Sequence, residues 1–149
     1  MLAASHTHNR AFSLIELVIV IVIIGIIAAI AVPRYASSLD NYRASLAARK
    51  VAADVAMAQA VARAASRSVT VTFDPALDHY TIEGGQSQRV NLSDAPFSSS
   101  VQADFGAGGS ALVFDGYGRN NNPGILRLRS GQAQRTVTVD PVTGACTIQ

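Results

Sequence analysis

Residues 14–32 read LIELVIVIVIIGIIAAIAV, and this stretch decides the architecture of the chain. Glu16 is the only charged residue within it. At about 1.5 Å of rise per residue, a helix of this length crosses the hydrocarbon core of a bilayer. A carboxylate at the centre of such a helix costs about 2.5–3.5 kcal/mol on insertion scales, so Glu16 requires compensation from its surroundings.

Three interpretations of this apolar segment remain open from its length and charge. Residues 29–31 (AIA) fit a signal-peptide cleavage site, with Arg10 as the basic residue ahead of the segment. The segment also fits an uncleaved anchor, or a helix that is retained after a leader is removed before Phe12. The positive-inside rule alone places the C-terminal part in the cytoplasm, because more basic residues follow the segment than precede it: Arg34, Arg43, Arg49 and Lys50.

A second helical segment is expected over residues 34–66, which are rich in Ala and contain neither Gly nor Pro. Pro33 predicts a kink between the two segments, which together form one helix of about 50 residues and roughly 80 Å. Apolar residues recur at helical spacing and predict a stripe whose second half packs on the chain's own domain: Tyr35, Leu39, Tyr42, Leu46, Ala53, Met57 and Val61. The charged residues are expected on the other side: Asp40, Arg43, Arg49, Lys50, Asp54 and Arg63.

From Ser68 onward the pattern changes to the alternation that is typical of half-buried strands. Short strands joined by Gly- and Pro-containing turns favour an antiparallel sheet. The expected strands are 69–73, 79–83, 88–92, a short one around Val101, 111–114, 125–129, 135–139 and 146–148. The sequence therefore predicts an α+β fold in which one long N-terminal helix covers an antiparallel β-sheet domain.

The charge balance of the β-rich part argues against a nucleic-acid-binding surface. From Arg67 to the end, six arginines face seven carboxylates, a net charge of −1, although the whole chain is at +2. A basic footprint for nucleic acid would be expected on this part. Only a local group on one expected hairpin remains as a candidate DNA contact: Arg127, Arg129 and Arg135.

No catalytic or metal-ligating constellation emerges from the sequence. His6 and His8 precede the apolar segment, and His79, alone at a strand start, is expected to be solvated, so we predict no metal site. Residues 115–122 (DGYGRNNN) offer oxygen ligands for Ca²⁺ but lack EF-hand spacing, and we interpret them as a hairpin loop. Cys146 can form no intrachain disulfide and has no basic neighbour in sequence to activate its thiol. We expect neither an enzyme nor a cofactor.

Residues 11–35, AFSLIELVIVIVIIGIIAAIAVPRY, strongly resemble the N-terminus of type IV pilins and type II secretion pseudopilins. The resemblance implies that a prepilin peptidase removes residues 1–11 between Ala11 and Phe12, with Ala11 where most members have Gly. It implies N-methylation of Phe12 and an assembly contact from Glu16, the fifth mature residue, to the Phe12 amine of a neighbouring subunit. Gly25 and Pro33 match the positions where many members loosen this helix.

The later segments SVTVTFDP and LVFDGYGR are similar to those of the GspH/FimT group of minor subunits. The resemblance implies a transmembrane and filament-core helix over residues 12–33, an amphipathic continuation over 34–66 and a periplasmic β-rich domain over 67–149. It implies that the subunit waits in the inner membrane and then joins other pilin or pseudopilin subunits. We expect a structural subunit, most readily of a type II secretion system, and keep a DNA-capturing or pilus-priming minor pilin as the alternative.

Overall fold

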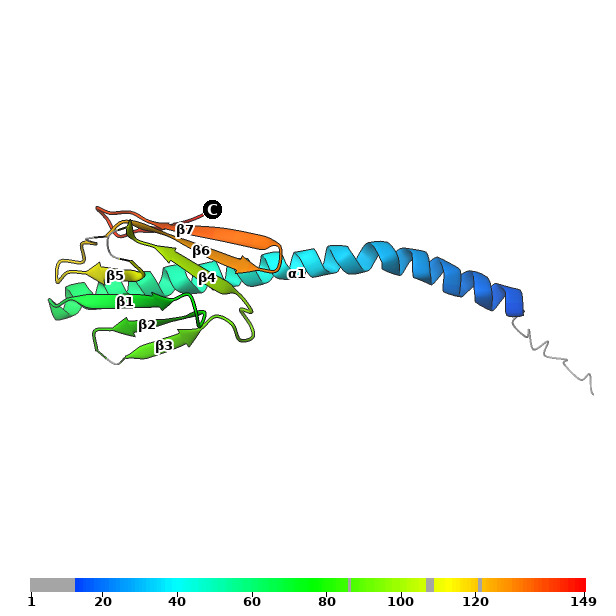
Figure 1. Ribbon diagram of the computed structural model, residues 1–149, viewed down its shortest axis with the longest axis horizontal. Coiled ribbons are helices and arrows are strands. Elements are labelled where there is room, and N and C mark those ends of the chain that lie inside the picture. The colour runs from blue at the N-terminus through cyan, green and yellow to red at the C-terminus, as the bar shows by residue number, and fades with distance from the viewer. Residues whose placement is uncertain (1–12, 86, 107–108, 121) are drawn as a thin grey trace, which may run out of the picture. The chain divides into compact units, whose positions relative to one another are not determined.

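The computed structural model describes residues 13–85, 87–106, 109–120 and 122–149 (Figure 1). Helix α1 (Leu14–Ala65) is followed by strands that confirm the expected positions. They are β1 (Val69–Asp74), β2 (His79–Glu83), β3 (Gln88–Asn91), β4 (Ser100–Asp104), β5 (Ala111–Phe114), β6 (Gly124–Ser130), β7 (Ala133–Val139) and β8 (Cys146–Ile148). The chain divides into two compact units, Met1–Ala36 and Ser37–Gln149, and the strands all belong to the second.

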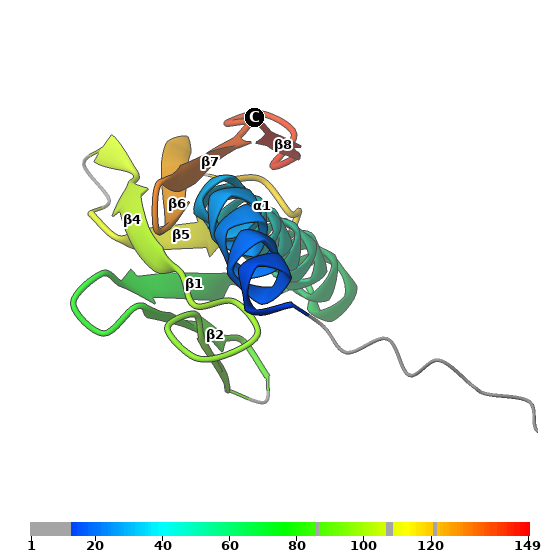
Figure 2. The same cartoon turned by 90° about the vertical axis from the view of Figure 1, so that its right-hand side faces the viewer.

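The strands form two four-stranded antiparallel sheets rather than one. Sheet A has the order β3-β2-β1-β5, and sheet B has the order β4-β6-β7-β8. Strand β4 pairs with β6 and not with its sequence neighbours, which separates the two sheets. Within the second unit, both sheets lie to one side of α1 when the molecule is viewed along the helix (Figure 2).

The inner faces of both sheets supply the large side chains of the core. In sheet A, the pairs Val71↔Ile82 and Phe73↔Tyr80 face inward, and in sheet B the pair Leu126↔Val137 does so. Strand β6 alternates between buried and exposed positions along its whole length, as a strand with one solvated face should. The core is therefore enclosed between two sheets and the second half of α1.

Helix α1 ends with a capping motif built on Ser66. This residue has a φ of 48°, in the left-handed region that terminates helices. The Ser66 N–H donates to the Arg63 carbonyl and the Arg67 N–H donates to the Ala62 carbonyl, at 3.3 and 3.2 Å. These two bonds satisfy carbonyls at the helix end and turn the chain into β1.

Helix α1 runs without interruption through both positions at which a bend was expected. Pro33 lies inside the helix, and Gly25 is helical with open space where a side chain would be. The bend at these residues stays a prediction, and so do the functional boundaries at residues 12–33, 34–66 and 67–149.

Candidate assembly surface on the long helix

The apolar segment over residues 14–32 is uncovered in the single chain. Its length and composition suffice for a membrane span, and none of the most apolar window is buried against other parts of the protein. Glu16 lies in the first turn of α1, where unpaired backbone N–H groups favour a carboxylate. Ala11 and Phe12, the expected cleavage and methylation positions, lie outside the described residues.

The second half of α1 packs on the sheets through small residues, which we call the alanine face. Its members are Ala44, Ala47, Ala48, Val51, Val55, Ala58 and Ala62, and all are fully buried. The prediction that the stripe of larger side chains packs on the domain is therefore wrong. Because the sheets already contribute large residues such as Phe73 and Tyr80 to the core, small residues on the helix let the elements approach closely.

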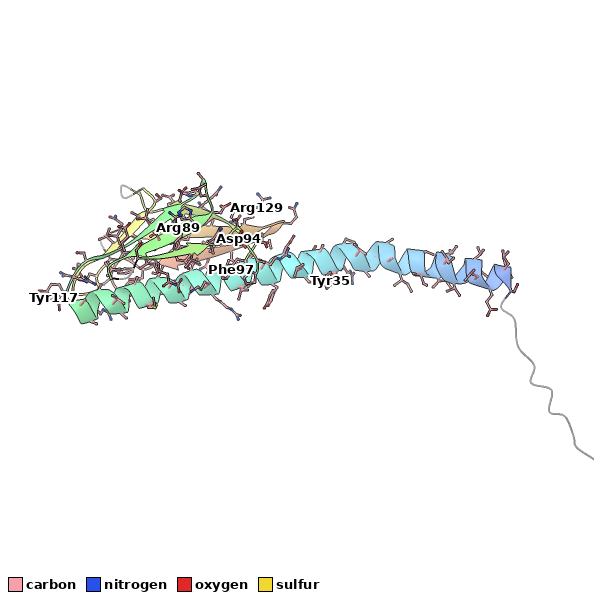
Figure 3. The ribbon with its side chains drawn as sticks, turned by 90° about the horizontal axis from the view of Figure 1, so that it is seen from below. Tyr35, Arg89, Asp94, Phe97, Tyr117 and Arg129 are labelled. Atoms are coloured by element: carbon pink, nitrogen blue, oxygen red, sulfur yellow. The ribbon has the colours of Figure 1, made fainter. Side chains whose placement is uncertain are left out.

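The predicted stripe exists, but it lies on the opposite side of the helix. We call it the outward stripe within the second unit: Leu39, Tyr42, Leu46, Ala53, Met57 and Val61. Tyr42 is 64% exposed and Met57 48% exposed, whereas Leu39 and Leu46 are half-buried. Tyr35, which the same pattern included, is also exposed (Figure 3). An apolar stripe that its own domain does not cover is typical of a surface for another protein or a membrane.

A buried charged network fastens α1 to sheet A. Asp54, which the pattern placed on the solvated side, is only 5% exposed, so that expectation is wrong. Its carboxylate accepts a hydrogen bond from the Tyr80 hydroxyl at 2.5 Å and pairs with the Lys50 ammonium at 2.8 Å. Burial, and then the bond and charge of Asp54, raise the pKa of Tyr80 far above its usual range. The network satisfies a charge that could not otherwise remain buried.

Further polar contacts hold the helix at both ends of the domain. The Gln59 side-chain amide donates to the carbonyls of Gly118 and Thr143, at 2.7 and 2.6 Å. At the other end, the Gln132 N–H in the β6–β7 turn donates to the Asp40 carboxylate at 3.4 Å. These contacts fix which face of the helix meets the sheets and leave the outward stripe uncovered.

The loop after β5 packs against the C-terminal end of α1, close to Tyr117 in Figure 3. The Asp115 carboxylate accepts bonds from the backbone N–H groups of Tyr117 and Arg119 and from the Arg119 side chain. The pKa of Asp115 is lowered, chiefly by the Arg119 N–H. Gly116 is required because a Cβ there would lie 2.8 Å from the Ser66 backbone carbon. The carboxylate that made this loop a Ca²⁺ candidate is thus engaged by N–H donors.

Strands β6 and β7 divide the three arginines proposed as a DNA contact between opposite faces of their hairpin. Arg127 and Arg129 lie on the exposed face of β6, and Figure 3 shows Arg129 pointing away from α1. Arg135 pairs with the buried Leu128, so it faces the helix. Its guanidinium donates to the Ser45 hydroxyl at 3.2 Å and to the Asn41 side-chain oxygen at 3.3 Å. The three residues share a hairpin but do not form one patch.

The remaining residues singled out for chemistry have structural positions. His79 is buried at the start of β2, contrary to the expectation that it is solvated. Cys146 begins β8 and is half-buried, and its burial raises the pKa of the thiol to about 11, as suits an unreactive packing residue. Within the described part of the chain, no three His, Cys, Asp or Glu side chains gather as a ligand set for a metal ion.

Known proteins share both parts of this arrangement. Residues 6–32 match the prokaryotic N-terminal methylation motif, and residues 47–144 match the family described as type II transport protein GspH. The chain is 34% identical over 111 residues to the type IV narrow pilus major component PilA5 of Thermus thermophilus, covering 56% of this chain and 96% of the relative.

Two solved structures share the fold at low sequence identity. The minor pseudopilin EpsH from the type 2 secretion system of Vibrio cholerae has a TM-score of 0.57 at 14% identity, covering 72% of this chain and 96% of EpsH. The type IV minor pilin FimU of Pseudomonas aeruginosa has a TM-score of 0.54 at 12% identity, covering 71% and 86%. These relatives are structural subunits and not enzymes, as expected. The chain belongs to the GspH family of type II transport proteins and is a pilin- or pseudopilin-like subunit of a type IV pilus-like filament.

Proposed function

We propose that the protein is a minor pseudopilin that assembles through α1 into the filament of a type II secretion system. One observation carries the proposal: α1 bears more apolar surface than its own domain covers. The segment over residues 14–32 is uncovered, and the outward stripe continues apolar character into the part of α1 that the sheets hold. The match to the GspH family supports a role in type II secretion, and the match to PilA5 supports a filament of pilus type.

The proposed assembly route begins in the inner membrane. A prepilin peptidase removes residues 1–11 on the cytoplasmic side, and the new Phe12 amine is methylated. The match to the methylation motif over residues 6–32 supports this processing. The β-rich domain then lies in the periplasm, as expected for a family whose domain faces outward. This orientation is the opposite of the one that the positive-inside rule gives.

Glu16 supplies specificity in this route. Before assembly its place in the first turn of α1 puts it at the edge of the apolar segment, where a charge costs less than at the bilayer centre. In the filament core the carboxylate requires a partner, which we propose is the Phe12 amine of the neighbouring subunit. Breaking a buried ion pair costs about 3–5 kcal/mol, so only the register that pairs the two groups is stable. Apolar contacts along residues 14–32 supply the adhesion.

Replacement of Glu16 tests this function. In cells that carry the secretion system, Glu16→Val should leave leader cleavage largely intact but reduce incorporation into filaments about tenfold or more. Glu83→Val serves as the matched control, because Glu83 is an exposed carboxylate at the end of β2. Incorporation is measured by comparing the sheared filament fraction with the membrane fraction. Normal incorporation of Glu16→Val would refute the proposed role of the carboxylate.

Capture of DNA remains the alternative function, now supported only by Arg127 and Arg129 on one exposed face. Because Arg135 faces the helix, the candidate patch is smaller than the sequence indicated. A gel shift of duplex DNA by the detergent-solubilised protein at low and high salt separates the two functions. Binding that weakens steeply with salt would favour DNA capture, and the absence of binding at low salt would exclude it.

A further inference from the structure

A groove with two cationic side chains lies between α1 and β7. We call it the cationic groove; it has a volume of about 380 Å³ and is lined by Asn41, Tyr42, Ser45, Leu46, Arg49 and Arg135. The lining residues come from the second unit, and they join three turns of α1 to the helix-facing side of β7. Among the described residues that line it there is no Asp or Glu.

The two arginines of the groove lack a counter-ion within the described part of the chain. Arg135 is half-buried, and its guanidinium donates only to neutral oxygens, on Ser45, Asn41 and Gln134. Arg49 is exposed and makes no hydrogen bond or ion pair with any described residue. Both described ion pairs of the chain, Lys50–Asp54 and Arg119–Asp115, lie outside the groove.

The groove therefore has the chemistry of an anion site. Guanidinium groups bind carboxylates through paired, charge-assisted hydrogen bonds, which are stronger than bonds to neutral acceptors. Ser45 and Asn41 already orient the Arg135 side chain, so little conformational entropy remains to be lost on binding. The Arg49 side chain is free to complete the site from the opposite wall.

Part of the helix wall of the groove is apolar and belongs to the outward stripe. Tyr42 and Leu46 line the groove and are members of that stripe. Because Tyr42 and Leu46 belong to both the groove and the outward stripe, a neighbouring subunit that packs on the stripe also meets the groove. We propose that the cationic groove receives an Asp or Glu side chain of the adjacent filament subunit. This inference rests on the proposed function, because it requires that the outward stripe is an assembly surface.

Photocrosslinking from position 42 in cells tests the inference. Replacing Tyr42 by benzoylphenylalanine in the full-length protein keeps an aromatic side chain at the mouth of the groove. Illumination of assembled filaments should join it to a subunit peptide that contains Asp or Glu. Adding Arg49→Glu should lower the yield of this product about tenfold or more, because an attraction becomes a repulsion.

The control variant is Arg89→Glu on β3, an exposed arginine without a partner among the described residues. It makes the same charge change outside the groove and should leave the yield within about twofold. Arg49→Glu removes no hydrogen bond or ion pair between described residues, so misfolding does not explain a loss. An acid-to-lysine change in the crosslinked neighbour should restore the yield with Arg49→Glu.

Each other outcome overturns the inference in a distinct way. An undiminished yield with Arg49→Glu in filaments that still depend on Glu16 would refute the groove but leave the proposed function in place. A product with the mass of an added phospholipid, instead of a subunit peptide, would assign the groove to a membrane headgroup. Failure of the protein without any of these substitutions to enter filaments would refute both the proposed function and the inference.

Discussion

Replacing Tyr80 by Phe removes the hydroxyl that joins sheet A to the buried carboxylate of α1. The Tyr80 side chain is fully buried, and its hydroxyl lies 2.5 Å from the Asp54 carboxylate. Hydrogen bonds to charged groups contribute about 1.5–3 kcal/mol, and the Phe ring otherwise fills the same space. Lys50 still pairs with Asp54, but its side chain is about one-third exposed, so it compensates only in part. We expect Tyr80→Phe to lower the free energy of unfolding by about 1.5–3 kcal/mol.

Urea-dependent pulse proteolysis of the detergent-solubilised protein measures this loss for Tyr80→Phe, Asp54→Ala and the double variant. Asp54→Ala leaves the buried Tyr80 hydroxyl without its acceptor. The double variant should therefore lose less free energy of unfolding than the two single variants lose together. The pH gives an independent readout. Because the folded-state pKa of Tyr80 is raised, its contribution is complete below about pH 10 and is lost as the pH rises further. A loss below about 0.5 kcal/mol, or additive losses, would refute the network.

Three further predictions follow from the packing of the domain. Ala48→Leu should lower the free energy of unfolding in urea titrations by about 1–3 kcal/mol, because Ala48 is fully buried. Ala53→Leu on the exposed side should change it by less than about 0.5 kcal/mol, and equal effects would contradict the assignment of the faces. Gly116→Ala should cost about 1–3 kcal/mol in the same assay, since the added carbon meets backbone; a neutral effect would show that the loop is not held against the helix. Alkylation of Cys146 by iodoacetamide at pH 8 should be about 100-fold slower in the folded than in the unfolded protein, because burial raises the pKa of the thiol from 9.0 to about 11. Equal rates would place the thiol in solvent.

The sequence predicted the positions of the strands well because each one carries its own local signal. Alternation of apolar and hydroxylated residues marks β1, and Gly or Pro marks the turns that follow several of the other strands. The division into two sheets was not predicted, because it depends on the pairing of β4 with β6 across the intervening β5. Such a pairing is specified by the assembled core and has no signature within either strand.

The orientation of α1 was predicted wrongly for a physical reason. The interpretation assumed that the largest side chains of the helix, such as Tyr42 and Met57, face its own domain. Hydrophobicity alone cannot distinguish an apolar stripe that packs within the chain from one that packs on another protein. The dense repetition of alanine at the helical phase of Ala44, Ala48, Ala58 and Ala62 was the available signal for the inner face.

The three arginines lie on one hairpin, as expected, but not on one face of it. Arg127 and Arg129 are two residues apart and share a face, as expected. The face of Arg135 depends on the register of the hairpin, which places it opposite the buried Leu128. A register with Arg135 opposite Arg127 or Arg129 would have put all three on one face.

Assembly through α1 requires an amine on Phe12, and mass spectrometry of the N-terminus of the filament-associated protein shows whether the chain begins there. We expect a chain that begins at N-methylated Phe12, and we expect that Ala11→Leu keeps the leader in place. A chain that begins at Val32 would identify a cleaved signal peptide, and an intact Met1 would identify an uncleaved anchor. Either of these termini would contradict assembly through α1 with a Phe12 amine as the partner of Glu16.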